Sequence, residues 1–326
     1  MIATAALAFA VLAATHEPSP AAIRASIARA LPSLKVAAET HAEKRACFAC
    51  HNQAHPMLAF DAAKKLGFEL DSEFVRDQVK HLRAFVTAHR KEWDELKGTG
   101  GHVDTAGWLL ATFEVAGEKP DADTASIAKY ILHRHAERKH WTTSSNRPPT
   151  QVSPFASSYL AVRSLKTWGT PDQKDAIAKR IDDVREWARK AKPKETEDRV
   201  YRLRLLQIAG ATSGDVAAAA KELLDDQRAD GGWPQLAKPG SDPYATATAL
   251  GALADAGDLS PKSNAYRRGV EYLLRTQRDD GTWLVATRAV PIQPYFEAGY
   301  PHGKDQFISS SAASWAVIAL AKAWEK

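Results

Sequence analysis

Hydrophobic and polar positions follow one another along this chain with the period of a helix. Apolar residues recur every three or four positions in long stretches, while runs that alternate residue by residue, as strands do, are scarce. In the segment 263–278, for example, Tyr266, Val270 and Leu273 fall on one side of a helix. The pattern favours an all-α fold. It predicts helices over 72–97, 103–117, 122–138, 153–168, 172–191, 196–210, 214–228, 243–257, 263–278 and 308–325.

The first residues carry a separate signal. Residues 2–14 form an apolar run with small residues at Ala13 and Ala14, as in the apolar region and cleavage site of a secretory signal peptide. The run is too short to cross a bilayer as a helix. No basic residue precedes it, so a misplaced start or a buried helix is the alternative. We expect residues 1–16 to be a signal peptide, the protein to be exported to the periplasm, and the mature chain to lack an integral membrane segment.

An internal repeat lies in the C-terminal half of the chain. The segment LDDQRADGGW at 224–233 recurs as LRTQRDDGTW at 274–283, and each copy precedes a helix rich in small residues. Trp233 and Trp283 are 50 residues apart, the length of a helical hairpin with its loops. A weaker copy begins at His140 and Trp141, whereas the hairpin around Trp187 lacks the signature. The repeat therefore indicates a series of helical hairpins.

These repeats resemble the Gln-Trp motifs of the squalene-hopene cyclase and protein prenyltransferase superfamily, which join outer to inner helices of an α/α barrel. The residues that carry the resemblance are Gln227, Asp230, Trp233, Gln277, Asp280 and Trp283. A glutamine at a helix end can bind the orphan backbone groups there, and a tryptophan can seal the loop. The resemblance implies a terpenoid cyclase-like α/α toroid, a barrel of helical hairpins, over residues 99–326. A helical segment, 17–98, would precede it.

The only cysteines lie in that N-terminal segment. Cys47, Cys50 and His51 form a Cys-x-x-Cys-His motif, the pattern for covalent attachment of a c-type haem. The two thiols would hold the haem, and His51 would bind its iron. Export agrees with this, because oxidising compartments are where such proteins mature. A disulfide or redox dithiol is one alternative, and a zinc site that uses His51 and a further ligand is another.

The second ligand of the iron is less clear from the sequence. The helix predicted over 72–97 should pack on the cysteine segment, so His81 or His89 is the candidate on the opposite side of the haem. The iron could also be five-coordinate. The tail 286–315, together with the Cys-x-x-Cys-His motif, resembles bacterial exported proteins of this repeat class. That second resemblance implies the same fold, but the class it points to has no settled biochemical activity.

A ligand mouth is expected where the inner helices begin, near Asp242 and after Asp305. Carboxylates and an imidazole there could perform acid–base chemistry, and the alternative is that they cap helices and shape loops. The candidate catalytic residues are Asp305, His302, Glu297 and Asp242, and the candidate lining residues are Tyr244, Arg288, Tyr295 and Tyr300. The Asp-x-Asp-Asp motif of squalene cyclases is missing from the sequence. So is a cysteine after Cys50 that a prenyltransferase zinc site would require.

Composition and charge narrow the classes of partner that the protein is expected to bind. The chain has 44 basic and 39 acidic residues, a net charge of +5, and the two signs are mixed without a basic stripe, so a nucleic-acid partner is not expected. The leading hypothesis is an exported haem c protein that transfers electrons or oxidises a small apolar or polyol-like ligand held in the toroid, with a possible redox partner protein. The alternatives are a cyclase- or lyase-like enzyme with a structural cysteine element, and a non-catalytic binding scaffold.

Overall fold

The computed structural model describes residues 18–143, 145–257, 260, 262–291 and 294–324. These residues contain no strand, only two isolated β-bridges, so the predicted all-α class is confirmed. The helices are α1 (Pro20–Lys44), α2 (His55–Lys65), α3 (Ser72–Ala88), α4 (Arg90–Asp94), α5 (His102–Val115), α6 (Ala122–His133), α7 (Pro154–Trp168), α8 (Lys174–Lys190), α9 (Thr196–Ile208), α10 (Ser213–Leu224), α11 (Pro243–Ala256), α12 (Asn264–Thr276) and α13 (Gln306–Trp324). A π-helical turn, η1 (Cys50–Ala54), leads into α2, and short 3₁₀ turns, η2 (Pro171–Gln173) and η3 (Gly303–Asp305), precede α8 and α13.

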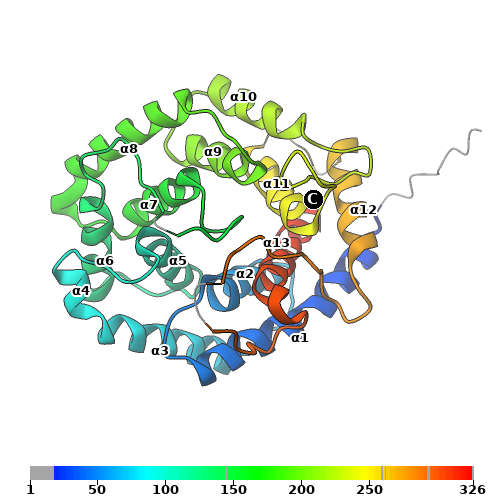
Figure 1. Ribbon diagram of the computed structural model, residues 1–326, viewed down its shortest axis with the longest axis horizontal. Helices are drawn as coiled ribbons and strands as arrows, with labels where there is room; N and C mark the ends of the chain where they lie inside the picture. Colours follow the sequence, from blue (N-terminus) through cyan, green and yellow to red (C-terminus); the bar gives the residue numbers. More distant parts are fainter. Residues whose placement is uncertain (1–17, 144, 258–259, 261, 292–293, 325–326) are drawn as a thin grey trace, which may run out of the picture.

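The helices form two concentric rings (Figure 1). The inner ring is closed, because α2 contacts α5, α5 contacts α7, and the sequence of contacts continues through α9, α11 and α13 back to α2. The outer ring consists of α1, α3, α4, α6, α8, α10 and α12. The predicted toroid is therefore confirmed. The division of the chain at residue 98 stays a prediction, and in the structure both parts supply inner helices to one ring.

The sequence of each helix matches its ring. The inner helix α11 (PYATATALGALADA) is buried on nearly every side, and its alanines and threonines let the neighbouring inner helices pack closely. The outer helix α12 is amphipathic instead: Tyr266, Val270 and Leu273 are buried against the inner ring, and its charged residues cover the other side. Helices with an all-round apolar surface can exist here only because the outer ring shields them from water.

The inner helices all begin on the same face of the ring, because each follows an outer helix that runs the opposite way. Side-chain caps fix several of these starts. Ser153 caps α7 by accepting a hydrogen bond from the backbone N–H of Ala156 (3.4 Å), and Asp242 caps α11 by accepting one from Ala245 (3.0 Å). The loops that enter the inner helices therefore meet on this face, which we call the mouth.

The Gln-Trp repeats form three similar corners at the mouth. The indole Nε1 of Trp233 donates to the carbonyl of Leu223 (2.7 Å), and that of Trp283 donates to Leu273 (2.8 Å). Trp141, in the weaker copy, donates to Ile131 (2.8 Å), again ten residues upstream. All three tryptophans are fully buried. Each one thus satisfies a carbonyl at the end of an outer helix and closes the loop that follows.

The glutamines of the repeats join neighbouring outer helices. The side-chain amide of Gln227 donates to its own loop at Gly231 (2.9 Å) and to Ala265 in α12 (2.8 Å). The amide of Gln277 donates to Gly281 (3.0 Å) and to Ser26 in α1 (2.9 Å). The bond from Gln277 to Ser26 connects the last outer helix, α12, to the first, α1, so the repeat motif itself helps to close the ring.

The two ends of the chain carry the predictions about export and the membrane. The signal peptide predicted at 1–16 lies outside the described residues. Among the described residues, Gly303–Trp324 is long and apolar enough to cross a membrane, but 78% of its apolar window is buried inside the protein. Its position in the inner ring explains that apolar composition.

Candidate functional site

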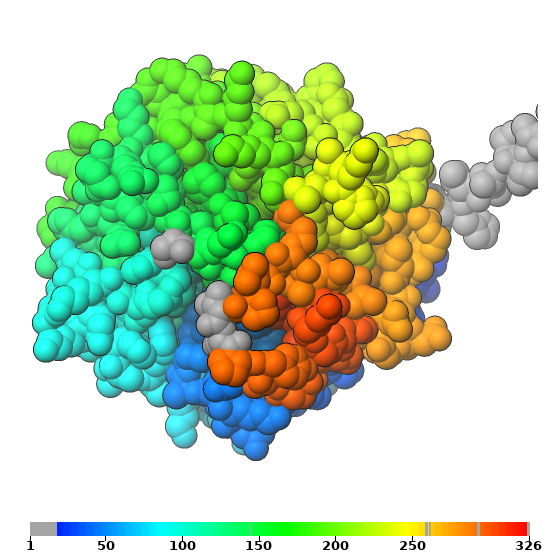
Figure 2. All heavy atoms as spheres, viewed as in Figure 1, coloured from blue at the N-terminus to red at the C-terminus, as the bar shows by residue number. Residues whose placement is uncertain are grey.

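A cavity of about 490 Å³ opens at the centre of the mouth, within the range typical of small-molecule sites. Figure 2 shows this face hollowed between the orange and red C-terminal segments and the blue N-terminal ones. Most of the cavity wall comes from residues 287–291 and 294–305, which lie at the mouth and which we call the strap. Its lining residues are His51, Arg147, Thr287, Ala289, Val290, Pro291, Pro294, Tyr295, Phe296, Ala298, Lys304, Gln306 and Phe307. The lining is mainly apolar.

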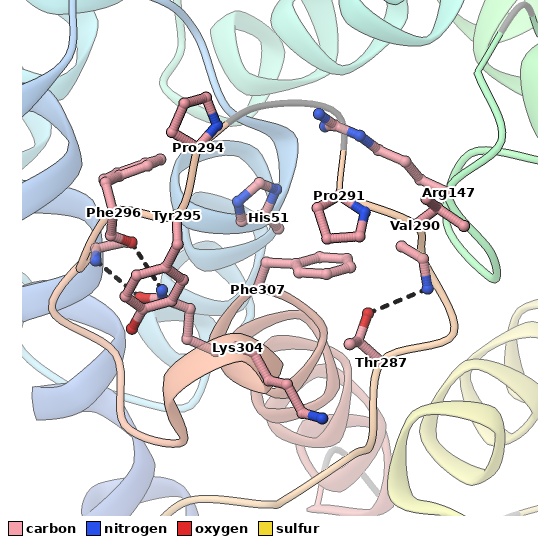
Figure 3. Close-up of a pocket in the computed structure, with 13 residues that line it drawn as sticks. His51, Arg147, Thr287, Val290, Pro291, Pro294, Tyr295, Phe296, Lys304 and Phe307 are labelled. Carbon is pink, nitrogen blue, oxygen red and sulfur yellow. Dashed lines mark hydrogen bonds between the residues drawn. The ribbon is translucent and has the colours of Figure 1, made fainter.

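His51 of the cysteine motif lies inside this cavity (Figure 3). The turn η1 places it there, and the hydroxyl of Ser310 in α13 donates to its backbone carbonyl (3.0 Å). Its ring packs against Phe307 with the ring centroids 5.3 Å apart. Burial lowers the pKa of His51 well below its ordinary value, so the imidazole is neutral at pH 7, the form that binds metals. Within the described residues neither ring nitrogen has a hydrogen-bond partner.

Two cations line the same cavity. Arg147 comes from the loop before α7, and Lys304 comes from η3 at the end of the strap. None of the described lining residues is an aspartate or a glutamate. Burial lowers the pKa of Arg147, while the thiols of Cys50 and Cys47 act in the opposite direction. The cavity is therefore apolar and positively charged.

The two thiols differ in their surroundings. Cys50 is buried, and burial raises the pKa of its thiol to about 12. Its sulfur accepts a hydrogen bond from the side-chain amide of Gln151 (3.8 Å). Cys47 is exposed and lines a neighbouring cavity of about 850 Å³ with Phe48 and Phe85. Both cysteines are reduced and unpaired in this structure.

The residues predicted as second iron ligands face that neighbouring cavity, not the one that contains His51. His81 uses both ring nitrogens: Nδ1 shares a hydrogen bond with Gln53 (3.0 Å), and Nε2 shares one with the carbonyl of Arg45 (2.7 Å). His89 uses Nδ1 on the carbonyl of Phe85 (2.9 Å). The structure thus does not bring either of them opposite His51, and a role as second ligand stays a prediction.

One residue of the mouth cavity, His51, fits the iron-binding role in a covalently held haem, whereas neither thiol of the motif lines this cavity. A neutral, unpartnered imidazole faces an apolar space, as an iron-binding histidine requires. Both thiols lie near the guanidinium of Arg147, which itself lines the cavity. No described group of three or more His, Cys, Asp or Glu side chains could hold a metal ion, so the zinc alternative gains no support from the described residues.

The four residues predicted to be catalytic lie around the strap, outside the cavity lining. Asp305 accepts a hydrogen bond from the backbone N–H of Thr287 (2.8 Å), and Glu297 accepts one from the hydroxyl of Tyr295 (2.6 Å). His302, at a φ of 88°, shares a hydrogen bond with Thr282. Asp242 caps α11. These contacts shape the loops and helix ends, and an acid–base role for the four residues stays a prediction.

The residues predicted to line the mouth divide into two groups. Tyr295 lines the cavity and is 59% exposed. Arg288 instead fastens the strap to the rim, with its guanidinium 2.7 Å from the carboxylate of Glu195. Tyr300 and Tyr244 are fully buried packing residues. The strap is further held by Gln306, whose side-chain amide donates to the carbonyl of Phe296 and accepts from the N–H of Ala298.

Sequence reasoning missed two buried acids beneath the mouth. Glu197 accepts a hydrogen bond from the hydroxyl of Tyr244 (2.9 Å), and burial raises its pKa to about 8. Asp104 accepts one from Ser157, and burial raises its pKa to about 6. Both sit in the first turn of an inner helix, where a carboxylate normally indicates only a favourable interaction with the helix dipole. Only the closed ring shows that they are buried.

Arg147 was missed as well. In the sequence it stands in a loop of prolines and uncharged polar residues, and nothing distinguishes it from other arginines. The position of Arg147 in the sequence could have identified it. It lies between the predicted corner at Trp141 and the start of an inner helix, and a residue in such a loop must lie at the mouth.

Comparison with solved structures places this architecture among known folds. A protein from Actinoplanes shares 16% identity with a TM-score of 0.55, over 90% of this chain and 99% of that one. A variant of the type II terpene cyclase MstE from Scytonema, in complex with geranylgeranyl dihydroxybenzoate, shares 14% identity with a TM-score of 0.57, over 92% and 98%. The apo form of MstE gives 12%, 0.52, 91% and 99%.

The chain has a terpene cyclase-like toroid fold. Identities at this level establish the fold alone. No family model matches the chain.

Proposed function

We propose that this protein is an exported haem c protein whose haem is held at the mouth of the toroid, and that it serves in electron transfer. The observation that carries the proposal is the position of His51. A motif histidine with a neutral, unpartnered imidazole lies inside an apolar cavity, beside a loop that also contacts the buried thiol of Cys50. Cys47 and Cys50 would hold the group and His51 would bind its iron.

The covalent step needs no oxidant or reductant. Each thiol would add its S–H across one vinyl C=C bond of the haem, so that a C–S bond would form and the proton would go to the other vinyl carbon. The bound iron would supply a one-electron couple. The apolar lining would exclude water from the iron, and the strap would cover it. The signal peptide predicted at 1–16 belongs to this proposal, because the protein would mature in the periplasm.

A second candidate is the binding of a terpenoid-like apolar ligand in the same cavity. The fold shared with the cyclase MstE and the apolar lining favour it. Protonation of a C=C bond in that cavity lacks an acid, because the described lining has no carboxyl group. The buried acids Glu197 and Asp104 have the raised pKa that such chemistry requires, but they do not line the cavity. For this second candidate we therefore favour ligand binding over catalysis of a cyclisation.

The experiment is production of the full chain, with its own leader, in a host that carries the haem c maturation machinery. We expect a red protein whose Soret absorption survives denaturation and remains with the polypeptide on a denaturing gel. Replacement of both cysteines (Cys47→Ser with Cys50→Ser) should remove the covalent absorption. His51→Ala should change the spectrum or prevent attachment, whereas His133→Ala, at the end of α6 and outside the cavity lining, is the matched control.

A colourless, folded protein from this host would overturn the haem proposal. The same sample then tests the second candidate, by titration with geranylgeraniol and with a saturated hydrocarbon of equal length. A preference for the isoprenoid that is lost in Phe307→Ala would support a terpenoid-binding mouth. Absence of binding to either probe would leave that candidate unsupported too.

A further inference from the structure

We infer that the mouth cavity selects a dicarboxylate ligand with an apolar body, and that Arg147 and Lys304 each pair with one of its carboxylates. This rests on the proposed function in one respect, since a haem has this chemistry: an apolar ring with two propionates. The chain itself places two positive charges, Arg147 and Lys304, around an apolar space.

The first support is that Arg147 has no counter-charge. Within the described residues no carboxylate lies within ion-pair distance of its guanidinium, and its side chain makes no hydrogen bond there. Arg83 and Arg288 are paired with carboxylates, since Arg83 contacts Glu118 (2.6 Å) and Arg288 contacts Glu195 (2.7 Å). Arg180 is satisfied by backbone carbonyls instead. A partly buried, unpaired guanidinium is costly, and a bound carboxylate would offset that cost.

Lys304 supplies the second charge. It lines the same cavity, and the described residues offer its ammonium group neither a salt bridge nor a hydrogen bond. Figure 3 shows Arg147 extending above His51 and Lys304 on the opposite side of Phe307, with its ammonium group pointing away from His51. The nearest acids in the strap are engaged elsewhere, since Asp305 binds the N–H of Thr287 and Glu297 binds the hydroxyl of Tyr295. The two cations are thus available to a ligand.

The position of Arg147 is fixed before any ligand binds. Its backbone forms an isolated bridge with Gln151, with N–H to carbonyl distances of 3.2 and 2.9 Å. The side chain of Gln151 in turn donates to the sulfur of Cys50. One short hairpin therefore links the proposed carboxylate-binding residue to the proposed attachment residue. The fixed backbone limits the entropy lost when a carboxylate binds to that of the Arg147 side chain.

The test separates carboxylate recognition from covalent attachment. In the full-length Cys47→Ser/Cys50→Ser protein, protoporphyrin IX and its dimethyl ester are titrated while tryptophan fluorescence is followed. We expect the diacid to bind about tenfold more tightly than the diester, as for a desolvated charge-assisted hydrogen bond. Arg147→Gln and Lys304→Gln should each reduce that ratio. Lys64→Gln, at the end of α2 and away from the cavity lining, should leave it unchanged.

Equal affinities for the diacid and the diester would overturn the inference, even if the maturation host yields a red protein. An unchanged ratio in both Arg147→Gln and Lys304→Gln would overturn it as well. If no porphyrin binds, dodecanedioate and dodecanediol are compared in the same way. A preference for dodecanedioate that Arg147→Gln and Lys304→Gln each reduce would uphold dicarboxylate recognition while the haem proposal fails. No preference would end the inference too.

Discussion

The corner at Trp233 offers a direct test of how the ring is stabilised. Replacement by alanine removes a fully buried indole and its hydrogen bond to the carbonyl of Leu223. Loss of a buried tryptophan side chain costs about 3–5 kcal/mol of unfolding free energy. The carbonyl of Leu223 keeps a second donor, the backbone N–H of Asp226 at 3.3 Å, so the lost bond adds only about 0.5–1.5 kcal/mol. The expected destabilisation is about 4–6 kcal/mol.

The same change at Trp141 should cost more. The carbonyl of Ile131 has no other donor among the described residues, so its only partner is removed, which adds about 1–3 kcal/mol. The guanidinium of Arg180 also lies over the Trp141 ring, 3.9 Å from its centroid. Trp187 is the control, because its hairpin lacks the repeat signature and its indole is only partly buried.

Unfolding in urea, followed by circular dichroism, measures these differences, and a thermal melt provides a second reading. At about 2 °C per kcal/mol, Trp233→Ala should lower the melting temperature by about 8–12 °C. The order of destabilisation should be Trp141→Ala, then Trp233→Ala, then Trp187→Ala. A loss below about 1 kcal/mol for Trp233→Ala would refute the reasoning, because the tryptophan would then not be closing its hairpin.

Three further predictions concern pH, ring closure and the strap. Burial keeps the folded Glu197 carboxyl protonated up to a pKa of about 8, against an ordinary value of 4.5. The unfolded state therefore binds fewer protons in that window, so unfolding free energy should fall as the pH rises from 6.5 to 8, by at most about 1.4 kcal/mol per unit. Glu197→Gln should flatten this fall in urea titrations, and an identical slope would contradict the assignment. Gly281→Ala should destabilise by more than about 1 kcal/mol, because φ is +82° and a Cβ would meet the carbonyl of Arg29 in α1. Gly210→Ala, also at positive φ but with open space around it, should cost less, and equal losses would argue against the close contact. Asp305→Asn weakens the hydrogen bond that holds the strap, so it should speed limited proteolysis of the strap with little change in global stability. An unchanged cleavage rate would show that this contact does not hold the strap.

Local patterns in the sequence determined most of the fold. The helical period, the Gly-Trp corners and the capping residues act over ten or fewer residues, so the starts of α7, α9 and α11 were predicted within one residue. The predicted helix 72–97 is divided into α3 and α4 at His89, and the helical segment predicted over 17–98 contains one helix of 25 residues, α1, that was not predicted individually. Such differences arise where packing, not local preference, sets a boundary.

The site depended on long-range contacts that no local pattern reveals. His51, Arg147 and Lys304 are separated by 96 and 157 residues, and only closure of the ring brings them around one cavity. Closure likewise buried Glu197. The predicted catalytic residue Asp305 contacts Thr287 within the strap. Sequence by itself thus determined which hairpins form, because hairpins depend on near neighbours. Tertiary structure alone decided which side chains share a space, because that depends on how the first and last helices meet.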